Sequence, residues 1–322
     1  MEKKEPIVGS AIEPCESKKD LEEIASFANR LLLLFLASYG LSSIVVRIVK
    51  RSMKRALEDD LSRILLLCVV LILVLVLGSR LFHTTPKRIA FGERTAPKLP
   101  AMDSILLTLS LFFFEWGIVF LSLPFMKRFS PDEFNPDPLS YFLMIAIIGF
   151  CILVPVNEEI LFRRIGFQYA QKHGTMFAVI TSSIMFAFAH GVRFQVFYAL
   201  LLGLCAGILC AKTGSILWPI LLHMVHNGFN FVMPHLFPFY EGIPSLRFYS
   251  LWVLFAVLCA VCFLLYAARQ QISLRNVSIK ASMRTFWTQM KSDKSKYKAY
   301  FTSAGGLGFI LIAIINLLGW LI

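Results

Sequence analysis

The sequence contains few charged residues. Asp, Glu, Lys and Arg make up 16% of the 322 residues, whereas 57% are hydrophobic and the mean hydropathy is +0.70. A soluble domain has about a quarter charged and about half apolar residues. The sequence also lacks the short alternating segments of a membrane β-barrel. These absences exclude an ordinary soluble domain and indicate that lipid is the solvent for most of the chain.

Metal-binding and disulfide motifs are also missing. There is no HExxH, the usual pattern of a zinc protease. Six of the seven cysteines lie inside apolar runs, where cysteine acts as a small hydrophobic residue. Cys259 and Cys262 have CxxC spacing but share one such run, so no disulfide framework is indicated. No cleavable signal peptide is visible in the polar residues 1–28, and we expect insertion to begin with the first spanning helix.

The most prominent feature of the sequence is a series of long apolar runs. A spanning helix needs roughly 20 mostly apolar residues, and in lipid the backbone must satisfy its own hydrogen bonds, which favours helices. We therefore expect an all-α, polytopic transmembrane helix bundle with eight or nine spanning helices. The runs lie near residues 31–49, 62–82, 104–126, 140–156, 175–192, 194–212, 215–233, 248–268 and 304–322.

The net charge of +12 does not indicate nucleic-acid binding. Lys and Arg cluster between the apolar runs, where membrane topology and contacts with anionic headgroups explain them. We expect membrane lipid to be a partner and nucleic acid not to be one. The predicted location is an integral, multi-pass membrane protein, and the compact loops favour a bacterial plasma membrane.

The chain divides by composition into four predicted parts. A polar N-terminal tail (1–28) precedes a membrane domain (29–268) whose catalytic core is expected at 140–233. A basic polar insert (269–302) precedes a final transmembrane helix (303–322). The insert has two interpretations, an amphipathic helix on the headgroup surface or a solvated linker, and the sequence does not choose between them.

Ionisable groups inside spanning helices are costly, so each is a candidate functional residue. All but Glu115 fall within one stretch of 70 residues, from Glu158 to Asn227. The candidates are Glu115, Glu158, Glu159, Arg163, Arg164, His190, His223, His226 and the strongly polar Asn227.

The segment VPVNEEILFRR (154–164) contains two adjacent carboxylates. Glu159 and Arg163 are four residues apart and share a helical face, so they are expected to pair. Glu158 is rotated by about 100° from Glu159 and is left to handle a proton. Because an apolar site disfavours a charged carboxylate, Glu158 suits a general base near neutral pH.

Two further segments contain imidazoles at helical spacing. FAFAH (186–190) places Phe186 and His190 four residues apart, and HMVHN (223–227) does the same for His223 and Asn227. Donors on one face can stabilise an oxyanion. Glu158 and His190 each lie 16 residues from Gly174, so in a helical hairpin they reach the same depth, roughly 24 Å from the turn. The sequence therefore predicts that the four residues converge on one cavity.

The three segments together resemble the motifs of the CAAX protease and bacteriocin-processing (Abi) family, over about residues 140–233. The resemblance implies that Glu158 is the general base for a water also held by His190. It implies that His223 and Asn227 stabilise the oxyanion. The supporting residues would be Glu159 and Arg163, which orient the site, and Phe186, which shapes the pocket.

The resemblance implies an intramembrane endopeptidase acting on a peptide or a prenylated protein. Eukaryotic relatives remove the last three residues of prenylated CAAX proteins, and prokaryotic relatives are linked to bacteriocin immunity and to signalling. Members are often labelled metalloproteases, and zinc would use Glu158, His190 and His223. Asn227 is a poor zinc ligand, so we favour a metal-free glutamate-type mechanism.

Other interpretations stay open for these residues. Glu115 is expected to be structural, either bonding a neighbouring helix or lining a cavity, and His226 to pack or support the site. A non-catalytic peptide-binding scaffold for immunity or signalling is an alternative that the motifs do not exclude. A transporter would spread polar residues over more helices and show inverted repeats, and the sequence shows neither.

Overall fold

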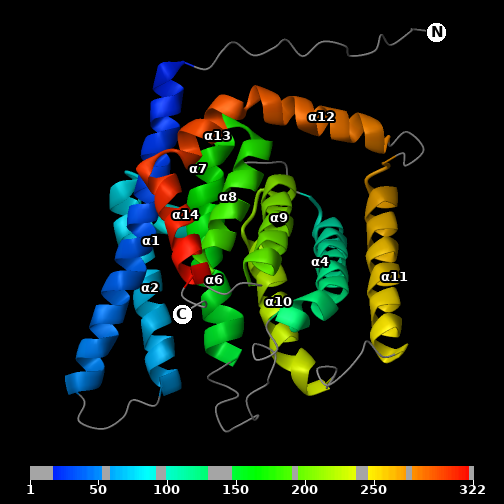
Figure 1. Ribbon diagram of the computed structural model, residues 1–322, viewed down its shortest axis with the longest axis horizontal. Helices are drawn as coiled ribbons and strands as arrows, with labels where there is room; N and C mark the ends of the chain where they lie inside the picture. The colour runs from blue at the N-terminus through cyan, green and yellow to red at the C-terminus, as the bar shows by residue number, and fades with distance from the viewer. Residues whose placement is uncertain are drawn as a thin grey trace.

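The computed structural model describes residues 17–52, 59–91, 99–129, 147–190, 195–236, 246–272 and 278–318. Residues 1–16 of the predicted tail, 140–146 of the fourth apolar run and 319–322 of the last run lie outside the described residues. Within the described part, every regular element is a helix (Figure 1). The predicted all-α fold is therefore confirmed for these residues.

The described chain consists of long helices and of shorter helical segments between them. Their bounds are α1 (Lys18–Ser52), α2 (Asp59–Leu81), α3 (Pro86–Phe91), α4 (Ala101–Phe129), α9 (Gln195–Thr213), α10 (Leu217–Leu236), α11 (Leu246–Arg269), α12 (Ile279–Ser292), α13 (Lys294–Phe301) and α14 (Ala304–Leu318). Between α4 and α9 the chain forms η2 (Ile147–Leu153), α6 (Val154–Glu159), η3 (Ile160–Phe167), α7 (Gln168–Ala170), η4 (Gln171–His173) and α8 (Thr175–Ala189).

Four described helices are long and apolar enough to cross a membrane. They are Lys18–Ser42, Ala101–Ser122, Gln195–Thr213 and Tyr249–Arg269. A fifth span is counted if α13 and α14, bent by 68°, are taken together. The chain is thus a helical membrane bundle, while the finer count of eight or nine spans goes beyond these helices.

The segments η2, α6 and η3 follow one another without a break (Ile147–Phe167), and we call them the central helix. Segments η2 and η3 are π-helical and flank the short α6, and π-helical insertions often occur at functional sites. Pro155 stands near the start of α6, directly after the π-helical η2, where its missing N–H removes one backbone hydrogen bond to the preceding turn. Asn157 donates to the Leu67 carbonyl at 3.0 Å. This bond fixes the central helix against α2, one residue before Glu158.

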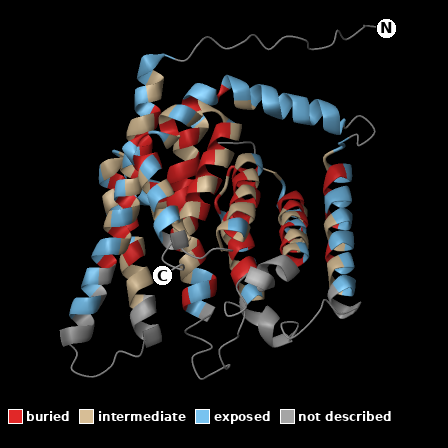
Figure 2. Cartoon of the chain, viewed as in Figure 1, coloured by how far each residue is buried: buried red, intermediate tan, exposed pale blue. Residues whose placement is uncertain are grey.

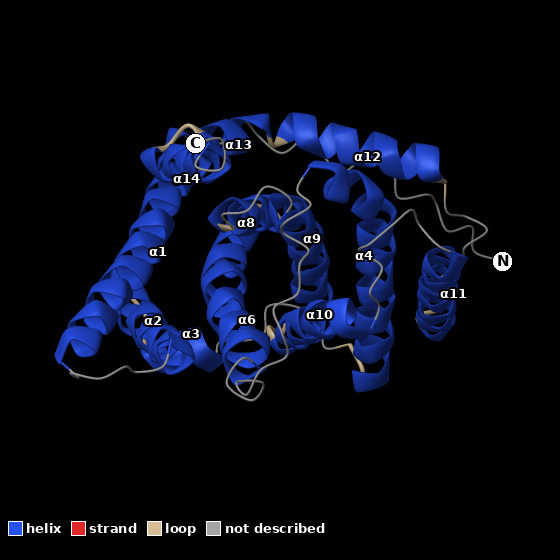
Figure 3. Cartoon of the chain, turned by 60° about the horizontal axis from the view of Figure 1, so that its bottom comes forward, coloured by secondary structure: helices blue, strands red, loops and turns tan. Residues whose placement is uncertain are grey.

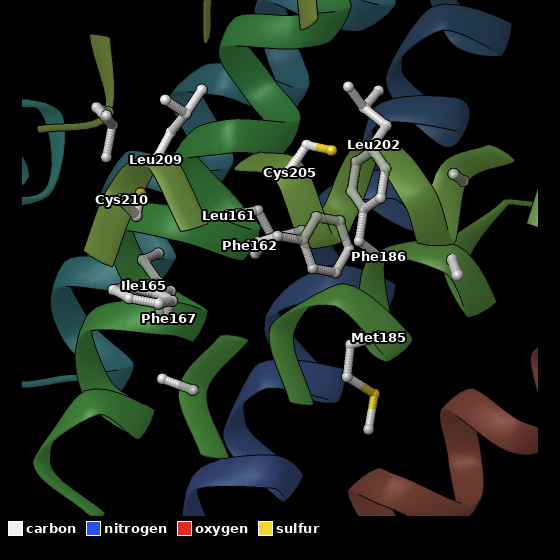
Figure 4. Close-up of a cluster of buried hydrophobic side chains, with 14 of the residues drawn as sticks. Leu161, Phe162, Ile165, Phe167, Met185, Phe186, Leu202, Cys205, Leu209 and Cys210 are labelled. Carbon is white, nitrogen blue, oxygen red and sulfur yellow. The ribbon is translucent and has the colours of Figure 1, made fainter. Parts of the chain in front are cut away.

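The hydrophobic core runs through most of the bundle, and the part that positions the motif residues lies between the central helix, α8 and α9 (Figures 2 and 4). At Gly203 an added Cβ would lie 3.1 Å from the Ser183 Cα, so the glycine lets α9 approach α8 closely. The side chains drawn in Figure 4 fill the space between these helices, and they leave the motif residues little freedom to rotate. The labelled ones are Leu161, Phe162, Ile165, Phe167, Met185, Phe186, Leu202, Cys205, Leu209 and Cys210.

Candidate active site

Glu159 and Arg163 form the ion pair that their spacing predicts. Arg163 Nε lies 3.2 Å from Glu159 Oε2, and both side chains are fully buried. The guanidinium also donates to the carbonyls of Ser182 (3.5 Å) and Gly203 (3.4 Å) and lies over the Phe186 ring at 4.8 Å. One cation therefore holds the central helix, α8 and α9 together.

His223 on α10 reaches the other oxygen of the same carboxylate. Its Nδ1 lies 3.0 Å from Glu159 Oε1. Since a carboxylate only accepts, Nδ1 carries the proton in this contact. Glu159 thereby orients the imidazole ring, whose Nε2 points toward Glu158 at 3.8 Å.

His190 is oriented in a similar way at the end of α8. It is the residue after the last helical turn, with an extended backbone, and its Nδ1 lies 2.7 Å from the Phe186 carbonyl oxygen. A carbonyl also only accepts, so Nε2 is again the atom turned toward Glu158, at 3.7 Å. Phe186 packs against both imidazoles, with ring centroids 4.6 Å from His190 and 5.5 Å from His223.

Glu158 lies between these two rings. The same atom, Oε2, faces both Nε2 atoms and is buried without a hydrogen-bond partner among the described residues. The side chains of Glu158 and His190 keep 15% of their surface exposed, whereas His223 keeps 3%. The structure therefore brings three of the four predicted catalytic residues together, at an edge that is open on the side of Glu158 and His190.

Asn227 makes a hydrogen bond that the sequence did not predict. It lies one helical turn after His223 on α10 and is 6% exposed. Its Nδ2 donates to the Phe150 carbonyl at 2.8 Å. One amide hydrogen is thus committed to η2, and the second is left for any other acceptor.

A second buried pair lies behind the site. His226 Nδ1 is 2.8 Å from Glu115 Oε1 of α4, with side-chain exposures of 5% and 0%. Trp116 covers the imidazole, with ring centroids 5.3 Å apart. Glu115 therefore contacts a neighbouring helix at ion-pair distance, while neither of its oxygens has a hydrogen-bond partner among the described residues. No local spacing predicted this partner, because the two residues come from helices far apart in the sequence.

The donor atoms at Glu158 suit zinc by type. Both imidazoles present Nε2, and each Nδ1 is held by an oxygen acceptor, as is usual for metal-bound histidine. Within the described ranges, however, no group of three or more His, Cys, Asp or Glu side chains has the geometry of a metal site.

Comparison with known proteins supports the motif assignment. Residues 140–229 match the family model described as type II CAAX prenyl endopeptidase Rce1-like. An Escherichia coli protein described as "Uncharacterized 24.3 kDa protein" is 32% identical over 108 residues, which cover 31% of this chain and 47% of that protein. The chain thus spans about half the length of this curated relative. No solved structure matches. The resemblance to the CAAX protease family that the three motifs carry is therefore confirmed, for residues 140–229.

Proposed function

We propose that this chain is an intramembrane endopeptidase of the CAAX-protease type. The observation that carries the proposal is a carboxylate oxygen, Glu158 Oε2, facing the Nε2 atoms of His190 and His223 at 3.7 and 3.8 Å. These separations are longer than direct hydrogen bonds, so Glu158 Oε2 is left to accept from a water that lies beside the two rings. A peptidase of the general-base type needs such a water.

In the proposed reaction, Glu158 takes a proton from the water while the water oxygen attacks the scissile carbonyl. His190 accepts the second hydrogen bond of that water through Nε2. The C–N bond then breaks, and the proton on Glu158 passes to the leaving nitrogen. No other reactant is consumed.

The oxyanion would be held by His223 and Asn227. His223 can donate from Nε2 only as an imidazolium, since its Nδ1 hydrogen already points to Glu159. The Glu159 carboxylate accepts that Nδ1 hydrogen at 3.0 Å and is itself paired with Arg163 at 3.2 Å. Asn227 contributes the amide hydrogen that Phe150 does not use. Donors of this kind stabilise charge that appears only in the transition state.

Zinc remains the alternative to a metal-free mechanism. Glu158, His190 and His223 would hold the ion, which would lower the pKa of a bound water. Tetrahedral zinc with bonds near 2.0–2.1 Å puts its ligand atoms roughly 3.3 Å apart. The observed separations of 3.7 and 3.8 Å are wider by about 0.4 to 0.5 Å, which small side-chain rotations would close. We propose the metal-free mechanism because the fourth polar group, Asn227, is a poor zinc ligand.

The substrate is proposed to be a peptide with a lipidated or apolar end, or a prenylated protein. The description of the matching family model supports a prenylated substrate. We further propose that shorter apolar helices, such as Leu65–Leu81 and Thr175–Ala189, also cross the membrane. With the four or five longer spans these make six or seven, and counting the Ile147–Phe167 stretch and α10 as well would give the eight or nine expected from the apolar runs. A bacterial plasma membrane is the proposed location.

The test is to incubate purified protein with prenylated and unmodified peptides, with and without a metal chelator. We expect cleavage near the peptide end that survives the chelator and is lost in Glu158→Gln. Inhibition by the chelator, reversed by added zinc, would replace the metal-free mechanism. Substrate binding by the wild type without product from any peptide would favour the non-catalytic scaffold.

A further inference from the structure

Helix α12 is a separate surface element. It begins after the cap residue Ser278, whose side chain accepts from the Ala281 N–H, and ends at Asp293. None of its residues is buried. Figure 2 shows the helix coloured almost entirely as exposed, with Met290 alone intermediate, in contrast to the neighbouring bundle.

Its apolar residues all fall on one side. With about 100° of rotation per residue, Ile279, Met283, Phe286, Trp287 and Met290 lie within an arc of roughly 100°. Four of them are strongly exposed: Ile279 (76%), Met283 (55%), Phe286 (43%) and Trp287 (56%). We call these five residues the apolar arc.

The basic residues border this arc on one edge. By the same rotation, Lys280, Arg284 and Lys291 lie next to Trp287, and small polar residues such as Ser292 and Thr288 fill the opposite side. No acidic residue occurs within α12. An apolar arc with a basic border is the pattern of a helix lying in a membrane interface.

The position of α12 fits an interface of this kind. In Figure 1 it runs across one end of the bundle, from α13 toward α11, and crosses the direction of α4, α9 and α11. Figure 3 shows the same course along the edge of the bundle. Lys296 on α13 anchors that end, donating to the His173 carbonyl at 2.8 Å and to Asp293 at 2.9 Å. Helix α12 therefore lies near the level at which the bundle helices end.

The apolar arc is exposed to the same degree as the lipid-facing side of a spanning helix. On α11, Val257 and Leu264 are each 52% exposed, and lipid chains cover such residues in a membrane. Leaving the arc in water would cost about 25 cal/mol for each Å² of apolar surface. Lipid at the end of the bundle removes this cost without any further protein.

We propose that α12 is an interfacial helix, with the apolar arc inserted among acyl chains and Lys280, Arg284 and Lys291 bound to anionic phosphate headgroups. The proposal is independent of the peptidase function. It resolves the two interpretations of the 269–302 insert in favour of the headgroup surface.

The test uses the full-length protein in bilayers of phosphatidylcholine, with and without phosphatidylglycerol. A nitroxide label is placed at Met283→Cys on the apolar arc or at Thr288→Cys on the opposite side. The labelled wild-type chain gives the signal of the native cysteines for subtraction. Relaxation by oxygen reports contact with lipid, and relaxation by a water-soluble nickel chelate reports contact with water.

We expect the label at 283 to respond to oxygen and the label at 288 to nickel. Adding phosphatidylglycerol should raise the oxygen response at 283, and the triple change K280Q/R284Q/K291Q should remove that increase. Equal nickel responses at 283 and 288 would overturn the proposal in favour of a solvated helix. A label at 283 that is immobilised and shielded from both reagents would overturn it in favour of a protein partner or a second copy.

Discussion

Two buried Glu–His groups lie in this bundle: Glu115 with His226, and Glu158 with His190 and His223. They differ in the distance from carboxylate to imidazole and in their exposure to solvent. Glu115 has one imidazole, 2.8 Å away, and neither side chain is more than 5% exposed. Glu158 has two imidazoles at 3.7 and 3.8 Å and keeps 15% of its surface exposed. The short, fully buried pair (the closed pair) lowers the cost of burying charge, whereas the wider and partly exposed group (the open group) can bind and deprotonate a further molecule. Residue type alone does not separate these roles; geometry does.

The largest expected effect is on catalysis at the open group. Glu158→Gln keeps the size of the side chain but removes the base, and we expect peptide cleavage to fall by about 10² to 10⁴-fold. The melting temperature should stay close to that of the wild type. Rates and melting curves from one detergent preparation check both points. Full activity in this variant would contradict the proposed mechanism.

The next effect is on stability at the closed pair. Glu115→Ala leaves the His226 imidazole buried without its carboxylate, and breaking a buried pair costs about 3 to 5 kcal/mol. We expect a clear loss in the free energy of unfolding, with cleavage per folded molecule largely retained. Unfolding in a denaturant series would measure the free energy of unfolding. Single-turnover kinetics would measure cleavage per folded molecule. A Glu115→Ala variant with wild-type stability but no activity would contradict the structural role of Glu115 and would assign it to catalysis.

Asn227 combines a structural and a proposed catalytic role, because its amide bonds η2 and is also proposed to hold the oxyanion. Asn227→Ala is expected to lower kcat by about 10² to 10³-fold, as for other lost oxyanion donors, with KM little changed. A loss in the free energy of unfolding without a fall in kcat would instead mean that the amide serves only the hydrogen bond with Phe150.

The smallest effect is expected from Glu115→Gln. The amide keeps the shape of the carboxylate and can still hydrogen-bond His226, so the change in stability should be within about 1 kcal/mol. Cleavage should stay close to wild type. This variant is the matched control for Glu158→Gln, since both make the same chemical change in a buried Glu–His group.

Apart from the meeting of Glu158 with His190, which their equal depth in a hairpin predicted, the contacts that the sequence predicted lie within one helix. Glu159 with Arg163, and Phe186 with His190, stand four residues apart, and helical geometry alone brings such residues together. The helical fold also followed from the apolar runs, because lipid leaves the backbone few other ways to satisfy its hydrogen bonds. The basic insert was left undecided, since composition fits both a linker and an interfacial helix.

The contacts that the sequence missed all cross between helices. His223 to Glu159, His226 to Glu115 and Asn227 to Phe150 depend on how α10 is rotated and set against its neighbours. Helical periodicity fixes which residues share a face, but not which helix that face meets. For that reason Glu159, assigned only to orient the site with Arg163, also holds His223.

By itself, the sequence determined a helical membrane protein with three polar motifs, because apolar run length and the spacing of four are local properties that lipid enforces. The tertiary structure alone decided which carboxylate is closed by a partner and which stays open between two imidazoles. That choice depends on side-chain packing among α4, the central helix, α8 and α10, where shifts of about 1 Å separate an ion pair from a site that holds water.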